Sequence, residues 1–280
     1  MRVREFEELA THRLQKAQRD SPRRSAQLLL CHVLHCDRLG LFLQDKRNLL
    51  PKEEKALFHL LAKREKGMPI AYLLGEKEFF GRRFLVSEKT LIPRPETEHL
   101  IEAVLERFPE KASALFVDLG CGTGNIGLTL ALERPYFSGI LLDKSREALN
   151  VCQNNRQRFS LNDRILLFQG TFEALPFAKE SLDLIVANPP YIGFEEKNRI
   201  MDEVLLFEPH CALFAEDNGL ADLETILNGA EFALKKGGFL ILEHGDRQGK
   251  ILRKRLANAF SDIITLCDLA SRERITLGKR

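Results

Sequence analysis

Residues 115–125 spell LFVDLGCGTGN, a strand-like apolar stretch that passes directly into a glycine-rich turn. A helix-like stretch begins near Ile126, so the local order is strand, turn and helix. Because glycine has no Cβ, such a turn lets a nucleotide-type ligand approach the bare backbone. The pattern predicts one unit of a parallel α/β sheet with a ligand loop at the sheet's edge.

Two kinds of ligand fit this loop. Gly122, Gly124 and Gly127 match the G-x-G-x-x-G spacing of NAD-binding turns. Asp118 argues against NAD, because a carboxylate there would crowd a pyrophosphate, whereas it suits a ligand that carries a cationic group. The D-x-G-x-G-x-G form that begins at Asp118 resembles the S-adenosylmethionine loop of class I methyltransferases, and we favour this interpretation.

Polar residues also follow the next two strand-like stretches. Asp143 ends the second one, where it can accept from both ribose hydroxyls or cap the helix that begins near Ser145. Thr171 follows the third one, where many methyltransferases have an acidic residue that accepts from the adenine amine. We therefore expect adenine recognition to depend on backbone groups and on stacking against Phe172, which also suits a place in the core.

The tetrad Asn188-Pro189-Pro190-Tyr191 follows the apolar stretch 182–187. The prolines hold the turn rigid, so the Asn188 side-chain oxygen and the Pro189 carbonyl can face one point. Two acceptors at one point suit a planar NH2 group, which has two N–H donors, and Tyr191 offers a ring face for stacking. The alternative is an Asx-type turn that only ends the strand.

Three motifs together resemble the HemK/PrmC family. They are the loop from Asp118 to Gly124, the NPPY tetrad, and IPRPETE at residues 92–98. NPPY alone is shared with adenine-N6 and other amino methyltransferases, whereas PRPETE is far more selective. Further matches are FEP at 207–209, GGFLILEHG at 237–245 and RITLG at 274–278. The resemblance covers nearly the whole chain, with departures at Cys121, Thr171 and Phe172.

The resemblance implies an S-adenosylmethionine-dependent enzyme that methylates N5 of the glutamine in the GGQ loop of peptide-chain release factors. It implies a class I (Rossmann-like) α/β methyltransferase fold with a small N-terminal helical domain. The residues expected to bind the cofactor are Asp118, Gly120, Cys121, Gly122, Thr123, Gly124, Asp143, Phe172 and Asn188. The residues expected to be catalytic are Asn188, Pro189, Pro190 and Tyr191.

Two other functions remain open. One is an amino methyltransferase that acts on adenine or guanine in nucleic acid, although no basic and aromatic stripe suggests a strand-binding surface. The other is a non-catalytic S-adenosylmethionine-binding module, which is disfavoured because both the loop and the tetrad are intact.

Helical periodicity and turn residues divide the chain into three parts. Periodicity up to about residue 66 predicts a bundle of four or five helices. If the protein acts on release factors, we expect residues 1–70 to form its substrate-docking domain. Residues 71–96 are expected to form a β-hairpin linker with Gly81 at its tip. In residues 97–280, the catalytic domain, strands and helices alternate, and the last two strands, near 263–266 and 273–277, are expected to be antiparallel.

Composition limits the partners. A net charge of +2 over 280 residues argues against an enzyme that grips long duplex DNA. Residues 1–66 hold 15 Lys and Arg against 9 Asp and Glu, a net +6 that leaves −4 elsewhere. This excess could dock an acidic protein or RNA, but a solvated helical surface is favoured. No apolar stretch approaches the roughly 20 residues of a membrane span, and no signal sequence is evident, so we expect a cytoplasmic protein. We also expect it to be a monomer.

The remaining reactive side chains give weaker indications. The six cysteines include no CxxC pair and are expected to be free thiols, and Cys31 with His35 offers too few ligands for a metal. Glu243 and His244 end a strand, where a role in the site and a hydrogen-bonding role at the sheet's end are both open. Arg94 and Glu96 are expected in an interdomain ion pair, and Glu208 is expected to support the substrate loop.

Overall fold

The structure, a computed structural model, describes residues 1–174 and 177–280. The chain divides into two compact units, which we call the helical unit (residues 1–76 and 201–207) and the sheet unit (residues 77–200 and 208–280). The first boundary, between Glu76 and Lys77, falls inside the segment that the sequence predicts as a linker.

Five helices form within residues 1–76, all of which the structure describes. They are α1 (Val3–Lys16), α2 (Pro22–Leu34), α3 (Arg38–Leu43), α4 (Pro51–Glu65) and α5 (Ile70–Leu74). Proline begins α2 and α4, a position where the missing N–H is not needed. Phe6, Ala10 and Leu14 recur at four-residue spacing and are fully buried in the core of this unit. The predicted bundle of four or five helices is therefore confirmed.

The helical unit also contains a segment from much later in the chain. Helix α9 (Asp202–Phe207) is part of this unit, and its Glu203 accepts from Arg64 Nη1 at 2.5 Å. Arg64 is only 3% exposed and also donates to the Met68 carbonyl at 3.0 Å. The helical unit is thus completed by residues that follow the NPPY tetrad.

The predicted hairpin consists of β1 (Glu76–Phe79) and β2 (Arg82–Leu85), which form a two-stranded sheet. Phe80 and Gly81 connect them with φ of +49° and +71°. Positive φ at both central residues is the mark of a type I′ turn, whose twist matches that of the strands. The hairpin with Gly81 at its tip is confirmed.

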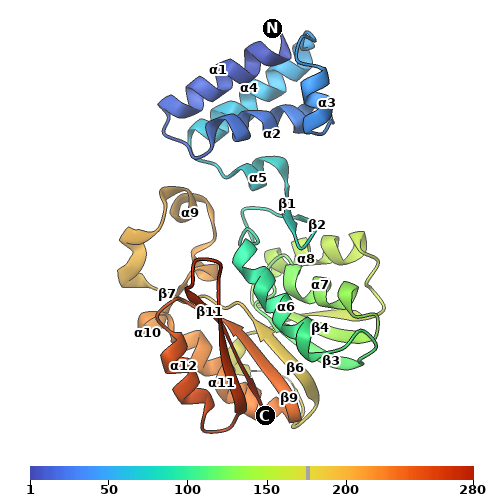
Figure 1. The fold of residues 1–280 in the computed structure, drawn as a ribbon, viewed down its shortest axis with the longest axis vertical. Helices are drawn as coiled ribbons and strands as arrows, with labels where there is room; N and C mark the ends of the chain where they lie inside the picture. Colours follow the sequence, from blue (N-terminus) through green and yellow to red (C-terminus); the bar gives the residue numbers. More distant parts are fainter. Residues whose placement is uncertain (175–176) are drawn as a thin grey trace. The chain divides into compact units, whose positions relative to one another are not determined.

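The sheet unit is built on seven strands in the order β10-β11-β9-β6-β3-β4-β5. Figure 1 labels β3, β4, β6, β9 and β11 of this sheet. Their bounds are β3 (Ala114–Leu119), β4 (Phe137–Asp143), β5 (Ile165–Gln169), β6 (Leu182–Ala187), β9 (Leu234–Glu243), β10 (Ser261–Cys267) and β11 (Glu273–Lys279). Strands β5, β4, β3, β6 and β9 are parallel, whereas β11 pairs antiparallel with both β9 and β10. This is the predicted class I methyltransferase sheet with its antiparallel ending.

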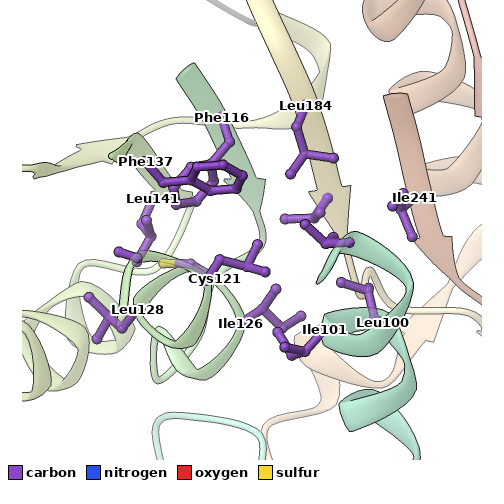
Figure 2. Packing of buried hydrophobic residues seen from close by; sticks show 14 of the residues in the cluster. Leu100, Ile101, Phe116, Cys121, Ile126, Leu128, Phe137, Leu141, Leu184 and Ile241 are labelled. Atoms are coloured by element: carbon purple, nitrogen blue, oxygen red, sulfur yellow. The ribbon is translucent and has the colours of Figure 1, made fainter. Parts of the chain in front are cut away.

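Helices cover both faces of this sheet. On one face, α6 (Glu98–Arg107), α7 (Asn125–Glu133) and α8 (Arg146–Arg158) contribute to a core around Phe116 and Leu184 (Figure 2). On the other face, α11 (Ala221–Ala233) and α12 (Gly249–Leu256) pack on Val117 and Ile185. Neighbouring strand residues thus enter opposite cores, as the alternation of side chains along a strand requires.

Short elements complete the sheet unit around the ends of the strands. They are η1 (Pro95–Thr97), η2 (Phe172–Ala174), η3 (Phe194–Arg199), η4 (His210–Ala212), α10 (Glu216–Gly219), β7 (Ile192–Gly193) and β8 (Phe214–Ala215). Throughout the described residues, no helix is both long and apolar enough to span a membrane.

Candidate active site

The register of the parallel strands brings the sequence motifs to one edge of the sheet. Leu119 is paired with Leu142 on one side and with Ala187 on the other. The next residues along these strands are Gly120, Asp143 and Asn188, so the glycine loop, the acidic residue and the tetrad meet at the carboxyl edge. This is where open α/β sheets bind their ligands.

Backbone contacts hold the glycine loop against β4. The Gly120 and Cys121 N–H groups both donate to the Leu142 carbonyl, at 2.8 and 3.0 Å. Gly120, Gly122 and Gly124 all have positive φ, from +53° to +79°, which favours glycine. A Cβ on Gly122 would meet no atom within 4 Å, so the loop presents bare backbone at this point.

Asp143 is fixed by the same loop. Its Oδ2 accepts from the Gly122 N–H at 2.9 Å and its Oδ1 accepts from the Ser145 N–H at 2.8 Å. Burial raises the pKa of Asp143, while these N–H groups partly offset the effect. The N-cap of α8 is Ser145, whose hydroxyl accepts from Ala148, so the capping role that was the alternative for Asp143 belongs to its neighbour.

Asp118 lies beneath the loop and not on a wall of the cleft. It is fully buried, and its Oδ2 accepts from the Gly127 N–H at 2.9 Å. Its Oδ1 has no hydrogen-bond partner within the described residues. Burial raises the pKa of Asp118 to about 7, and the Asp143 charge adds to this rise. Asp118 therefore supports the loop by its hydrogen bond to Gly127 and does not line the cleft itself.

A cleft of about 1010 Å³, part of it open to solvent, lies along this edge. It is lined by eight of the predicted site residues: Gly120, Cys121, Gly122, Thr123, Asp143, Phe172, Asn188 and Pro190. Asp118, Gly124, Pro189 and Tyr191 are not among its lining residues. Sequence reasoning missed Leu91, Asp222 and Cys211, which also line it. Of these, Leu91 directly precedes the IPRPETE motif, and this adjacency is a signal that could have found it.

The cleft fits an adenosyl group with a cationic tail. Phe172 lines it while packing on the core beside α11, and its ring would lie 3.3 Å from a Cβ on Gly120. The place in the core that the sequence left open for Phe172 is observed, and its stacking on an adenine stays a prediction. Carboxylates at Asp143 and Asp222, with the bare backbone at Gly122, provide acceptors and close approach for a polar ribose.

The tetrad is anchored from several sides. Asn188 Nδ2 donates to Thr97 Oγ1 at 3.2 Å, so Thr97 of the PRPETE motif holds the amide group. The Tyr191 hydroxyl donates to Glu243 Oε1 at 3.4 Å, and the Tyr191 carbonyl accepts from Gln248 Nε2 at 2.9 Å. Burial raises the pKa of the Tyr191 phenol. This tyrosine is half-buried against the core, and its use as a stacking face stays a prediction.

The Arg94 ion pair differs from expectation. Arg94 Nη2 donates to Glu208 Oε1 at 2.6 Å, while Glu208 Oε2 accepts from the Ile92 N–H at 3.2 Å. Arg94 and Glu208 belong to the same compact unit, so the expected interdomain pair is wrong. The buried Glu208 instead joins the IPRPETE segment to the segment that begins at Pro209, and both segments line the cleft.

His244 makes two hydrogen-bonding contacts at the end of the sheet. Its Nε2 is 2.8 Å from Thr276 Oγ1 and its Nδ1 is 2.8 Å from the Gly245 carbonyl. Burial lowers the pKa of His244, which keeps the ring neutral. Both ring nitrogens are thus occupied within the sheet, which favours the hydrogen-bonding role at the sheet's end.

Comparisons with known proteins agree with this geometry. Residues 7–75 match the PrmC N-terminal domain family, and residues 110–269 match a methyltransferase domain family. A solved 16S rRNA N2 G1207 methyltransferase of Thermus thermophilus shares the fold, with a TM-score of 0.51 and 19% identity. That match covers 73% of this chain and 49% of the other.

Curated relatives are similar over nearly the whole chain. The release factor glutamine methyltransferase of Nitratidesulfovibrio vulgaris is 40% identical over 270 residues, which cover 96% of this chain and 90% of the relative. The enzyme of the same name from Escherichia coli K12 is 40% identical over 261 residues, 93% of each chain. Identity at this level along both domains shows that the chain belongs to the release factor glutamine methyltransferase family.

Proposed function

We propose that this protein transfers a methyl group from S-adenosylmethionine to the side-chain amide nitrogen, N5, of the glutamine in the GGQ loop of peptide-chain release factors. The observation that carries the proposal is the placement of Asn188 beside the glycine loop, with Nδ2 bound to Thr97 and the side chain lining the cleft. This arrangement leaves Oδ1 to accept from a ligand. The names of the relatives support a glutamine of a release factor as the substrate, and the N5 atom and the GGQ loop belong to the proposal.

The cofactor is S-adenosylmethionine, whose sulfonium supplies a methyl group that is open to in-line attack. The glycine loop and Cys121 would approach the cofactor through their backbone, and Asp143 would accept from the ribose hydroxyls. Phe172 would stack on the adenine, because its ring already lines the cleft. Gly124 and Asp118 would support this binding from beneath.

The protein acts on the substrate mainly through position and electronic bias. An amide nitrogen is a poor nucleophile because its lone pair is delocalised into the carbonyl. Asn188 Oδ1 and the Pro189 carbonyl would accept its two N–H groups, orienting the nitrogen and favouring its pyramidalisation. Pro190 and Tyr191 would hold this acceptor pair in place. No strong base is needed, because the alkylated amide can lose its proton to water.

The same proposal assigns roles to the larger parts of the chain. Residues 1–70 would dock the release factor, residues 71–96 would link the parts, and residues 97–280 would hold the cofactor. We expect the enzyme to act on translation termination as a cytoplasmic monomer, without stable binding to nucleic acid.

The test is the transfer of labelled methyl from S-adenosylmethionine, with mass spectrometry to locate the label. Acceptors are unmodified release factors, total RNA and plasmid DNA at matched salt, and the control is a release factor whose GGQ glutamine is replaced by glutamate. We expect one methyl on the glutamine and none on the control. Label on nucleic acid with the release factor untouched would show instead that the tetrad serves a base amine.

A further inference from the structure

A buried carboxylate stands directly beside Asn188 in the sheet. Ala187 is paired with Leu242, so Asn188 and Glu243 are the next residues on adjacent strands. Glu243 is 1% exposed, and its Oε1 accepts from the Tyr191 hydroxyl at 3.4 Å. Its Oε2 is buried and has no hydrogen-bond partner in the part of the chain that the structure describes. A buried acceptor without a partner is rare in folded proteins, so its position next to Asn188 needs an explanation.

Thr97 lies between this carboxylate and Asn188. It is 1% exposed, and its hydroxyl oxygen accepts from Asn188 Nδ2 at 3.2 Å. The same hydroxyl interacts with the Glu243 carboxylate and lowers its pKa. A hydroxyl oxygen that accepts from one neighbour still has its own proton to donate to another.

The pKa of Glu243 depends on burial and on a small number of neighbouring groups. Burial is the dominant influence and raises the pKa of Glu243 to about 7. The Arg274 guanidinium on β11 and the Tyr191 hydroxyl lower the pKa, as Thr97 does, while Glu96 in η1 raises it. The carboxylate therefore lies within a group of polar side chains that reaches the cleft through Asn188.

We propose that Glu243 and Thr97 are positioning residues that determine which way the Asn188 amide points, an inference that rests on the proposed function. Neither residue touches the substrate. Both act through the direction of the Thr97 hydroxyl proton, which determines whether the Thr97 oxygen can accept from Asn188 Nδ2.

The physical reason is that an ionised carboxylate only accepts hydrogen bonds. The Thr97 proton must therefore point at Glu243, which leaves the Thr97 oxygen free to accept from Asn188 Nδ2. That bond keeps Oδ1 for the N–H groups of the substrate. If the amide were reversed, Asn188 would present N–H groups to N–H groups, and the pair would repel. A neutral Gln at position 243 can donate to Thr97 and so permit this reversal.

The first test replaces Thr97. Thr97→Val keeps the shape but has no hydroxyl, so we expect kcat to fall about 10- to 100-fold, as for other partners that orient a functional side chain. The dissociation constant for S-adenosylmethionine and the Tm should change little. Thr97→Ser keeps the hydroxyl and should retain kcat within a few-fold.

The matched control is Thr129→Val. Thr129 is also fully buried, in α7, and its hydroxyl has no partner within the described residues. The same chemical change there should leave kcat unaltered. Equal losses in Thr97→Ser and Thr97→Val, or full activity in Thr97→Val, would overturn the proposal.

The second test uses pH. In the wild type, kcat at saturating cofactor should rise as the pH increases through about 7, because only ionised Glu243 fixes the Thr97 proton. Glu243→Gln should lower kcat and remove this rise. Asp118, whose pKa is also about 7, must be separated from Glu243, so Asp118→Asn is measured in parallel and should retain the rise. A rise that survives in Glu243→Gln would contradict the proposal.

Failure of this inference is distinguishable from failure of the proposed function. If the wild type labels no release factor, the proposed function fails. If the wild type labels the glutamine while Thr97→Val and Glu243→Gln match it at every pH, only the positioning role fails.

Discussion

At the scale of single residues, replacing Asn188 should affect turnover and cofactor affinity differently. Asn188→Ala removes one of the two acceptors for the substrate amide but leaves the glycine loop and Asp143 intact. We expect kcat to fall by at least about 100-fold, the range found when one oriented polar group is removed from an active site. Isothermal titration should give nearly the wild-type affinity for S-adenosylmethionine. Equal losses of turnover and affinity would contradict the assigned role.

Asp143 should behave in the opposite way. Asp143→Ala removes the acceptor proposed for the ribose hydroxyls, so the dissociation constant for S-adenosylmethionine should rise at least about tenfold, or about 1.4 kcal/mol. Because Asp143 also accepts from Gly122 and Ser145, part of this rise will come from a looser loop. Asp143→Asn retains an acceptor oxygen and should give a smaller rise. An unchanged constant in Asp143→Ala would restrict the residue to a structural role.

Glu243 should make stability depend on pH. Its pKa is raised from 4.5 to about 7 by burial, so the folded protein retains a proton that the unfolded chain has released. Stability should therefore fall as the pH rises from about 4.5 to about 7. Glu243→Gln has no such proton, so at pH 8 it should be more stable than the wild type by up to about 3 kcal/mol. Urea unfolding at pH 5 and pH 8 measures this, and a difference that does not vary with pH would contradict it.

At the scale of elements, the glycine loop offers a contrast between two neighbouring positions. A Cβ on Gly124, where φ is +79°, would come within 2.6 Å of Cys152 Sγ and 2.9 Å of Leu128. Gly124→Ala should therefore destabilise the protein by about 2–5 kcal/mol, from backbone strain plus overpacking. A Cβ on Gly122 would meet no atom within 4 Å, so Gly122→Ala should lower the unfolding free energy by only about 1–2 kcal/mol, through the strain of its positive φ. Denaturant unfolding compares the two, and equal losses would contradict the packing argument.

The elements themselves were largely predictable from the sequence. The stretch 182–187 predicted β6 with its observed bounds, and the turn residues around Gly81 predicted the hairpin. Such signals are local, because periodicity and turn chemistry depend on neighbouring residues. The contact between Thr97 and Asn188 was not predictable, since it joins positions 91 residues apart and depends on how η1 packs against the end of β6. The same holds for Asp118, whose burial beneath the loop follows from packing.

At the scale of the whole molecule, the buried ion pair in the helical unit should determine how firmly α9 is held. Arg64→Ala leaves Glu203 and the Met68 carbonyl without their donor, so we expect a loss of about 1–3 kcal/mol in unfolding free energy. Protease cleavage within residues 194–207 should also become faster. The control is Arg4→Ala, since its pair with Glu8 is exposed and should contribute within about 0.5 kcal/mol. Equal losses in both variants would contradict this account.

The late position of α9 in the chain also has a consequence for synthesis on the ribosome. Residues 1–76 emerge first, but the segment 201–207 that completes their unit follows 125 residues later. At about 5–20 residues per second, roughly 6–25 s pass between the synthesis of residues 1–76 and that of α9. During that interval Arg64 has no Glu203 to neutralise it, and strands β3, β4, β5 and β6 are synthesised before α9 completes the helical unit.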